Sequence, residues 1–169
     1  LRARLGAWRR RRRELHPEHH ELRFDGFDAG SVFLDLEGSW YDPSPRSELL
    51  PRLTGQGVRC VPFVYDLMPL KFPDWFPPQQ VEVFGAWVEA HARHADAAFA
   101  ISDCTASDLA DAVRAIRPDR TIPTTVVPLG AELPTAAPRQ PDAAPAPDQR
   151  FLLVVGTVEP RKDQALVLD

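Results

Sequence analysis

The sequence predicts an α/β fold with a doubly wound parallel sheet, because short apolar segments alternate along the chain with segments of helical periodicity. The segment 58–65, VRCVPFVY, is almost continuously apolar, as is typical of a parallel strand covered on both faces. The segment 79–94 instead repeats its apolar residues at helical spacing, with Phe84 and Val88 on one face. A helix is therefore predicted there, and His91, on the same face, is expected to pack half-buried.

The remaining elements follow the same two patterns. Three further strands are predicted, at 31–36, 96–102 and 124–128. Three further helices are predicted, at 1–14, 48–53 and 105–116. The proline-rich segment 66–78 is predicted to be a loop. Pro62 is a counter-signal inside strand 58–65, because proline cannot donate to a ladder hydrogen bond.

Composition narrows the function classes. The formal net charge is -4 over 169 residues, so no nucleic acid is expected as a partner. Cys60 and Cys104 lie far apart without metal-ligand spacing, so we expect free thiols in a reducing compartment and no metal site. No apolar run reaches about 18 residues. The chain begins with Leu1 and stops inside a predicted helix, and we interpret it as a fragment of a cytoplasmic protein.

A proline- and alanine-rich segment separates two predicted domains. Residues 134–149 contain almost nothing to bury, which is typical of an extended linker. We therefore predict one domain at 1–133 and the start of a second at 150–169. The second is expected to open with an apolar strand at 150–156 and to continue into a helix at 160–169.

The turn GTVEPRK, which spans 156–162, is the sharpest candidate binding site. Gly156 would let the backbone approach a ligand closely. Arg161 and Lys162 put two cations at a predicted helix start, where acidic residues are usual. These cations and the helix N–H groups would hold a phosphate or diphosphate. The alternative is a solvated helix start whose cations face water.

Polar residues and glycines also follow the other predicted strands. Ligands of an open parallel sheet bind beyond the carboxyl ends of its strands. The residues at these positions are Asp35, Trp40, Tyr65, Asp66, Ser102, Asp103 and Gly130. They predict a cleft at this edge of the sheet. Two of them have structural alternatives, since Asp66 could make an Asx turn and Ser102 could cap the next helix.

Four consecutive blocks of sequence resemble the family-4 glycosyltransferases of GT-B architecture. The blocks are VPFVYDLMPLKFPDWF, HADAAFAISDCTASDL, VVPLGAEL and FLLVVGTVEPRKD. The resemblance runs from Ser31 to the end of the chain and is strongest to bacterial mannosyl- and rhamnosyltransferases. It implies two Rossmann-like domains that face a cleft. The N-terminal domain would receive the acceptor, and the C-terminal domain, of which only the first strand and helix are present, would bind a nucleotide sugar.

The resemblance also implies roles for residues on the donor side. Lys162 stands where the family has the lysine that contacts the donor diphosphate, and Arg161 and Gly156 adjoin it. Some members place an arginine directly after the glycine, but here that residue is Thr157.

On the acceptor side, Asp66 matches the family's aspartate and is expected to be catalytic, orienting or deprotonating the acceptor hydroxyl. Many relatives have histidine where this chain has Tyr65, so an acid/base role is not transferred to that residue. Ser102 and Gly130 match positions that line the cleft.

The implied reaction is a transfer with retained configuration that needs neither metal nor cofactor. A nucleotide sugar would be the donor, a glycan or lipid-linked glycan the acceptor, and the enzyme would make peripheral contact with the membrane. Two alternatives stay open. One is a non-catalytic binding or assembly module that uses its Arg-rich helix 1–14 as a contact surface, and the other is a GT-B epimerase or phosphorylase. A dinucleotide enzyme is not expected, because the GxG at 55–57 precedes a strand instead of following one.

Overall fold

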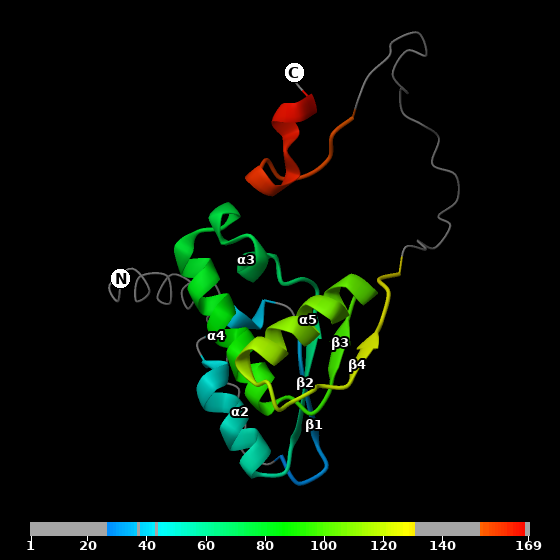
Figure 1. Ribbon diagram of the computed structural model, residues 1–169. Helices are drawn as coiled ribbons and strands as arrows, with labels where there is room; N and C mark the ends of the chain where they lie inside the picture. The colour runs from blue at the N-terminus through cyan, green and yellow to red at the C-terminus, as the bar shows by residue number, and fades with distance from the viewer. Residues whose placement is uncertain (1–26, 37, 43, 131–152, 168–169) are drawn as a thin grey trace, which may run out of the picture. The chain divides into compact units, whose positions relative to one another are not determined.

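The computed structural model describes residues 27–36, 38–42, 44–130 and 153–167 (Figure 1). The chain divides into two units, Leu1–Pro128 and Leu129–Asp169, each of which is described by itself. The predicted helix 1–14 and the predicted linker 134–149 lie outside the described residues, so both stay predictions.

The first unit contains a parallel sheet of four strands in the order of the chain. The strands are β1 (Val32–Asp35), β2 (Arg59–Val64), β3 (Ala98–Ala100) and β4 (Thr124–Val126). The longer helices are α2 (Arg46–Gly55), α4 (Pro78–His94) and α5 (Asp103–Ile116). Each lies at a position that the sequence predicted, so the α/β class and the parallel sheet are confirmed.

The segment predicted to be a loop at 66–78 contains two short helices instead. They are α3 (Met68–Lys71) and the 3-10 helix η2 (Pro73–Trp75). A third short element, the 3-10 helix η1 (Ser39–Tyr41), follows β1. In α3 and η2 a proline stands in the first turn, where its fixed φ suits a helix and its missing N–H would be unpaired anyway. Prolines that indicate a loop in sequence therefore start short helices here.

The described helices cover one face of the sheet. All three crossovers step in the same direction across the sheet, and right-handed crossovers then put α2, α4 and α5 on the same side. Figure 1 shows these helices packed beside one another there. On the opposite face Val32 and Leu34 are 51% and 46% exposed. The helices that a doubly wound sheet requires on that face are not among the described elements, so double winding stays a prediction.

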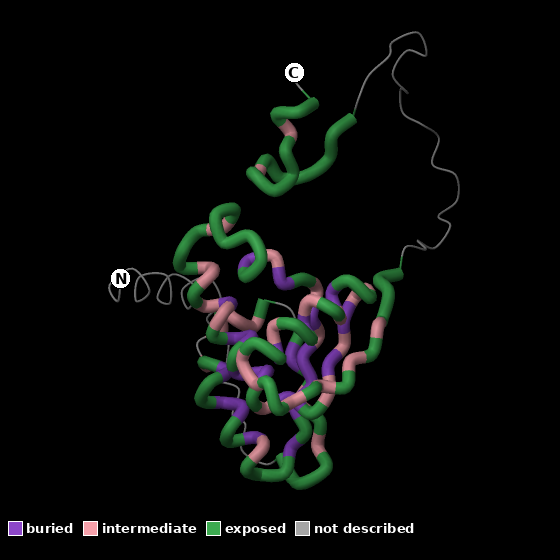
Figure 2. Tube along the Cα trace, in the orientation of Figure 1, coloured by how far each residue is buried: buried purple, intermediate pink, exposed green. Residues whose placement is uncertain are grey.

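The core lies between these helices and the sheet (Figure 2). One cluster is built around α4 and α5 and includes Val64, Phe84, Trp87, Val88 and Leu109. A second cluster joins α2 to the first half of β2 and includes Leu49, Leu50, Leu53 and Cys60. The central helix α4 contributes to both clusters, because its apolar residues recur at the spacing that fills one face.

Pro62 is compatible with its buried position in β2 because of the way in which β2 pairs with its neighbouring strands β1 and β3. Its Cα partner on β1 is Asp35, and β2 pairs with β3 only from Phe63 onward. Before that point Asp96 satisfies the β3 side of β2, since its carboxylate accepts the Cys60 N–H and its own N–H donates to the Cys60 carbonyl, both at 2.8 Å. A missing N–H at Pro62 therefore costs no ladder hydrogen bond.

Both cysteines are free, as predicted, but they differ in burial. Cys60 is buried, and this burial, followed by the charge of Asp96, raises the pKa of its thiol to about 11. Cys104 is exposed in the first turn of α5. Because the thiolate is the reactive form, Cys60 is a packing residue.

Candidate functional site

Three of the predicted site residues meet at the carboxyl ends of β2 and β3. Ser102 is the N-cap of α5, and its Oγ accepts the Thr105 N–H at 3.1 Å. The Thr105 hydroxyl in turn donates to the carbonyl of Tyr65 at 3.1 Å. These bonds tie the start of α5 to the end of β2 and leave Asp66, the next residue, exposed at the same edge.

The side chain of Asp66 makes the Asx turn that was its structural alternative. Its Oδ1 accepts the Met68 N–H at 2.9 Å, which starts α3. The carboxylate has a second oxygen, so this bond holds the group in place without using its whole acceptor capacity.

Gly130 is exposed and belongs to the second unit.

Ser102→Ala is expected to lower the free energy of unfolding by about 1 kcal/mol, because the first turn of α5 loses the acceptor for one of its unpaired N–H groups. Ser102→Asp restores such an acceptor and is expected to keep most of the stability. Urea unfolding followed by circular dichroism measures both variants. An alanine variant as stable as the wild type would show that the cap contributes nothing.

The second unit brings the cations of the GTVEPRK turn together with an acid of the same turn. Arg161 donates to Glu159 from Nε and Nη2, both at 2.9 Å, and Lys162 Nζ lies 3.4 Å from the same carboxylate. The hydrogen bonds from Arg161 lower the pKa of Glu159. Gln164 closes the turn by donating from Nε2 to the Thr157 carbonyl at 2.7 Å. The two cations therefore share one carboxylate at the surface.

The backbone conformation at position 156 favours glycine. Its φ is 146°, a conformation that favours glycine, and a Cβ atom there would meet Lys162 Nζ at 2.8 Å. The absent side chain therefore lets the ammonium of Lys162 lie directly against the backbone. The predicted role of Gly156, Arg161 and Lys162 in holding a diphosphate stays a prediction.

Two secondary-structure predictions in this unit are wrong. Leu153, Val154 and Val155 form no strand and are 73%, 48% and 81% exposed. A strand needs a neighbour to accept its ladder hydrogen bonds, and no strand lies beside them in the described part of the unit. The predicted helix is replaced by two 3-10 helices, η3 (Pro160–Lys162) and η4 (Gln164–Val167), separated by Asp163 at a φ of 44°. The helix N-terminus expected at the anion site is therefore not formed.

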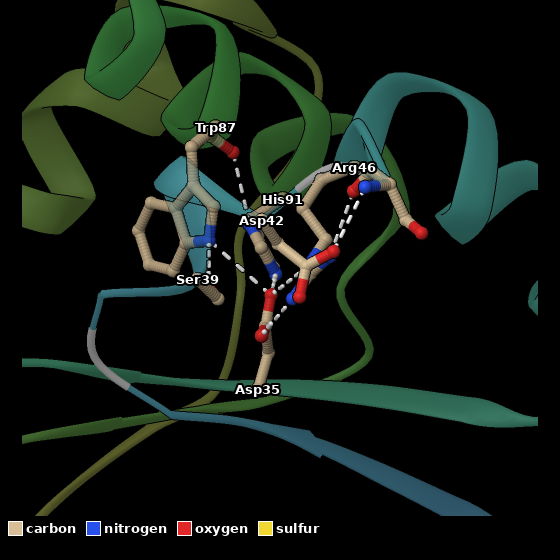
Figure 3. A network of polar contacts seen from close by, with 7 residues as sticks. Asp35, Ser39, Asp42, Arg46, Trp87 and His91 are labelled. Atoms are coloured by element: carbon tan, nitrogen blue, oxygen red, sulfur yellow. Dashed lines mark hydrogen bonds and ion pairs between the residues drawn. The ribbon is translucent and has the colours of Figure 1, made fainter. Parts of the chain in front are cut away.

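A buried polar network, which the sequence did not predict, surrounds Asp35 at the carboxyl end of β1 (Figure 3). Asp35 is only 2% exposed, and Arg46 donates to both of its oxygens, from Nε at 2.7 Å and from Nη2 at 3.0 Å. The indole N–H of Trp87 points at the same carboxylate at 3.2 Å and at the Ser39 hydroxyl at 2.7 Å. The network joins β1, α2 and α4.

His91 belongs to this network, so the prediction that it packs half-buried is wrong. It is 2% exposed, and its Nε2 lies 3.0 Å from Asp35 Oδ2. Its Nδ1 lies 2.9 Å from the Trp87 carbonyl, which can only accept a hydrogen bond. Each ring nitrogen of His91 therefore lies within 3.0 Å of an oxygen atom. The helical spacing of the sequence predicted which face of the helix carries His91. It did not predict that Asp35 of β1 would contact that face.

The network makes stability depend on pH in the acid range. Burial raises the pKa of Asp35, but the contacts with His91 and Arg46 outweigh it and lower the pKa from 3.8 to about 2. A lowered folded-state pKa contributes stability that is fully present well above pH 3.8 and is lost as the pH falls through 2. We expect a loss of about 2 kcal/mol from this group between pH 6 and pH 2.

Urea unfolding at several pH values between 6 and 2 measures this loss. Asp35→Asn has no carboxyl to titrate and is expected to show a shallower decline than the wild type over that range. Parallel declines in the two proteins would show that other carboxyl groups account for the acid sensitivity.

A hollow of about 620 Å³ lies in the helical layer between α3, α4 and α5. It is lined by Leu67, Leu70, Lys71, Gly85, Glu89, Arg93, Asp108, Asp111, Ala112, Ala115 and Ile116. Its cations are paired, Lys71 with Asp108 at 2.7 Å and Arg93 with Glu89 at 2.8 Å. None of the predicted site residues lines this hollow.

The described residues lack two further features, a cluster of metal ligands and a membrane-spanning helix. No group of three or more histidine, cysteine, aspartate and glutamate residues is placed to hold a metal ion in that part of the chain. Along the same ranges, no helix combines the length and apolar character that a membrane crossing requires.

A comparison with known proteins shows a similarity to a glycosyltransferase. The serotype-specific mannosyltransferase WbdA of Escherichia coli is 30% identical to this chain over 116 residues. The similarity points to a glycosyltransferase. The aligned region is 62% of this chain and 14% of that relative. No family model and no solved structure matches the chain.

Proposed function

We propose that the chain is part of a glycosyltransferase that moves a hexose, with mannose as the first candidate, from a nucleotide sugar to a glycan or glycolipid. The observation that carries the proposal is the similarity to a mannosyltransferase over 116 residues. It agrees with the GT-B resemblance of the four sequence blocks. The described residues support the proposal at two places, one for the donor and one for the acceptor.

On the donor side, Lys162 and Arg161 would bind the diphosphate. Both cations now contact the single carboxylate of Glu159 on the surface of the turn. A diphosphate carries more negative charge than one carboxylate and has several acceptor oxygens, so it would compete for these contacts. The missing side chain of Gly156 leaves the space beside the backbone in which the Lys162 ammonium lies. Two cations held close to the backbone are suited to stabilising the negative charge of a leaving diphosphate.

On the acceptor side, Asp66 would orient the attacking hydroxyl or take its proton. The Asx turn fixes its Oδ1, and its exposed position leaves the second oxygen available. Tyr65 anchors this point through its carbonyl and not through its phenol ring. Ser102 would act as a positioning residue, because its hydroxyl caps α5.

The proposed reaction retains the configuration of the sugar. The bond between the anomeric carbon and the diphosphate oxygen breaks as the bond to the acceptor oxygen forms, and the acceptor proton passes to Asp66 or to the leaving diphosphate. Negative charge grows on the diphosphate in the transition state, so Lys162 stabilises that state more than the bound donor. The resemblance implies that neither metal nor cofactor takes part. A lipid-linked acceptor and peripheral membrane contact belong to the same proposal.

The test uses the full-length gene product and measures nucleoside-diphosphate release from UDP-, GDP- and dTDP-hexoses, with and without extracted bacterial glycolipid. We expect release from one donor class that increases when acceptor is added. Absence of release with every donor, together with no binding of UDP or GDP by calorimetry, would overturn the proposal in favour of a non-catalytic module.

A further inference from the structure

The segment between β2 and α4 presents two stacked aromatic rings to solvent. The rings of Phe72 and Trp75 lie 4.3 Å apart between centroids with an interplanar angle of 11°. They are 41% and 40% exposed, which is high for large aromatic side chains. Exposed apolar groups that gather in one place often mark a binding site.

The stacked pair is held in a fixed geometry. Pro69 lies in the first turn of α3 and Pro73 in that of η2. Pro77 is the N-cap of α4, and Pro78 is the first residue of that helix. The Phe72 N–H donates to the Met68 carbonyl at 2.8 Å, and the Trp75 N–H donates to the Phe72 carbonyl at 3.0 Å. A ligand that stacks on the rings would therefore meet a preorganised surface and order little backbone on binding.

The segment also carries polar groups suited to hydroxyls, the indole N–H of Trp75 and the carboxylate of its neighbour Asp74. Within the described ranges, no acceptor meets the indole N–H of Trp75 and no donor meets the carboxylate of Asp74. Asp74 is the neighbour of Trp75 in η2 and is exposed. A flat apolar face with one donor and one charged acceptor is a common way to bind a polyhydroxylated ring.

The charges of the segment disfavour an anionic partner. Its ionisable residues with a fixed charge at neutral pH are Asp66, Lys71 and Asp74, so the acids outnumber the cation. The ammonium of Lys71 is already held by Asp108 on α5 at 2.7 Å. A bacterial membrane surface is anionic and is bound through clusters of free lysine and arginine side chains, which this segment lacks. The surface fits an uncharged ligand.

We propose that Phe72, Asp74 and Trp75 form a subsite for a neutral hexose unit of the acceptor glycan. This inference rests on the proposed glycosyltransferase function. The segment that carries the rings begins with Asp66 at the carboxyl end of β2, so the subsite and the proposed catalytic residue belong to one short stretch of chain. The C–H face of the sugar ring stacks on the aromatic pair, its hydroxyls accept from the Trp75 indole N–H, and they donate to Asp74.

The test measures binding of mannobiose and mannotriose to the full-length gene product without any donor, by saturation-transfer NMR and calorimetry. Trp75→Ala is expected to weaken binding about tenfold or more, whereas Trp75→Phe, which keeps a ring, loses less. Leu70→Ala removes a neighbouring exposed apolar side chain of the same segment and is expected to leave the affinity unchanged. Circular dichroism confirms that each variant is folded.

The outcomes separate this inference from the proposed function. If the wild type releases nucleoside diphosphate but binds no oligosaccharide, or if Trp75→Ala binds as tightly as the wild type, the subsite is refuted while the transferase proposal stands. A second experiment measures binding of the protein to phosphatidylglycerol vesicles by sedimentation. Loss of vesicle binding in Trp75→Ala with unchanged oligosaccharide binding would assign the rings to a membrane and overturn the inference.

Discussion

Asp35→Ala is expected to lower the free energy of unfolding by about 3–5 kcal/mol, a large part of the stability of a domain of this size. The substitution leaves the guanidinium of Arg46 and the ring of His91 buried without their shared carboxylate. Removal of one partner from a buried charge network is costly because the remaining charges stay desolvated. Denaturant unfolding of the wild type and the variant measures the difference.

Asp28→Ala is the matched control for this substitution. Asp28 is exposed, and its carboxylate accepts one hydrogen bond, from the Ser31 hydroxyl at 2.9 Å. Its removal is expected to cost under about 1 kcal/mol. If Asp35→Ala cost no more than this control, the buried network would not stabilise the fold, and its place between β1, α2 and α4 would need another explanation.

Lys162→Ala is expected to lower kcat/KM for sugar transfer by about 10²–10³-fold, because a cation aimed at the leaving diphosphate stabilises charge that develops in the transition state. Lys162→Arg keeps the positive charge and is expected to lose less. The measurement is nucleoside-diphosphate release under conditions where the wild type turns over, with melting curves recorded for each variant.

The chain provides a matched control, because Lys71 is its only other lysine. Its ammonium is paired with Asp108, and it plays no part in the proposed chemistry. Lys71→Ala is expected to keep kcat/KM within about twofold. Equal losses in the two lysine variants would mean that Lys162 has no special role, and the donor side of the proposal would then be wrong.

The sheet and its main helices could be predicted from sequence because their signals are local. The apolar run of β2 and the helical spacing in α4 depend on residues within one element. The face covered by the helices was not predictable in this way. It depends on the order of the strands, which is set by contacts between segments far apart in the chain.

The Asp35 network shows the same limit for the candidate site. Asp35 and Phe33 point to the same side of β1, so the alternation of the strand could have indicated an inward carboxylate. Its partners Arg46 and His91 come from two different helices, and no spacing in the sequence links them. Conversely, Leu153–Val155 has the composition of a strand but lacks a neighbour in the described part of its unit, so composition alone gave a wrong prediction.

The most direct test of the central claim is the mass of an acceptor oligosaccharide after incubation with nucleotide hexoses and the full-length gene product. Sugar transfer predicts acceptor masses that rise in steps of one hexose, only when donor is present, and far more slowly with Lys162→Ala than with Lys71→Ala. An acceptor whose mass never changes with any donor, while the protein is folded, would contradict the assignment of this chain to a glycosyltransferase.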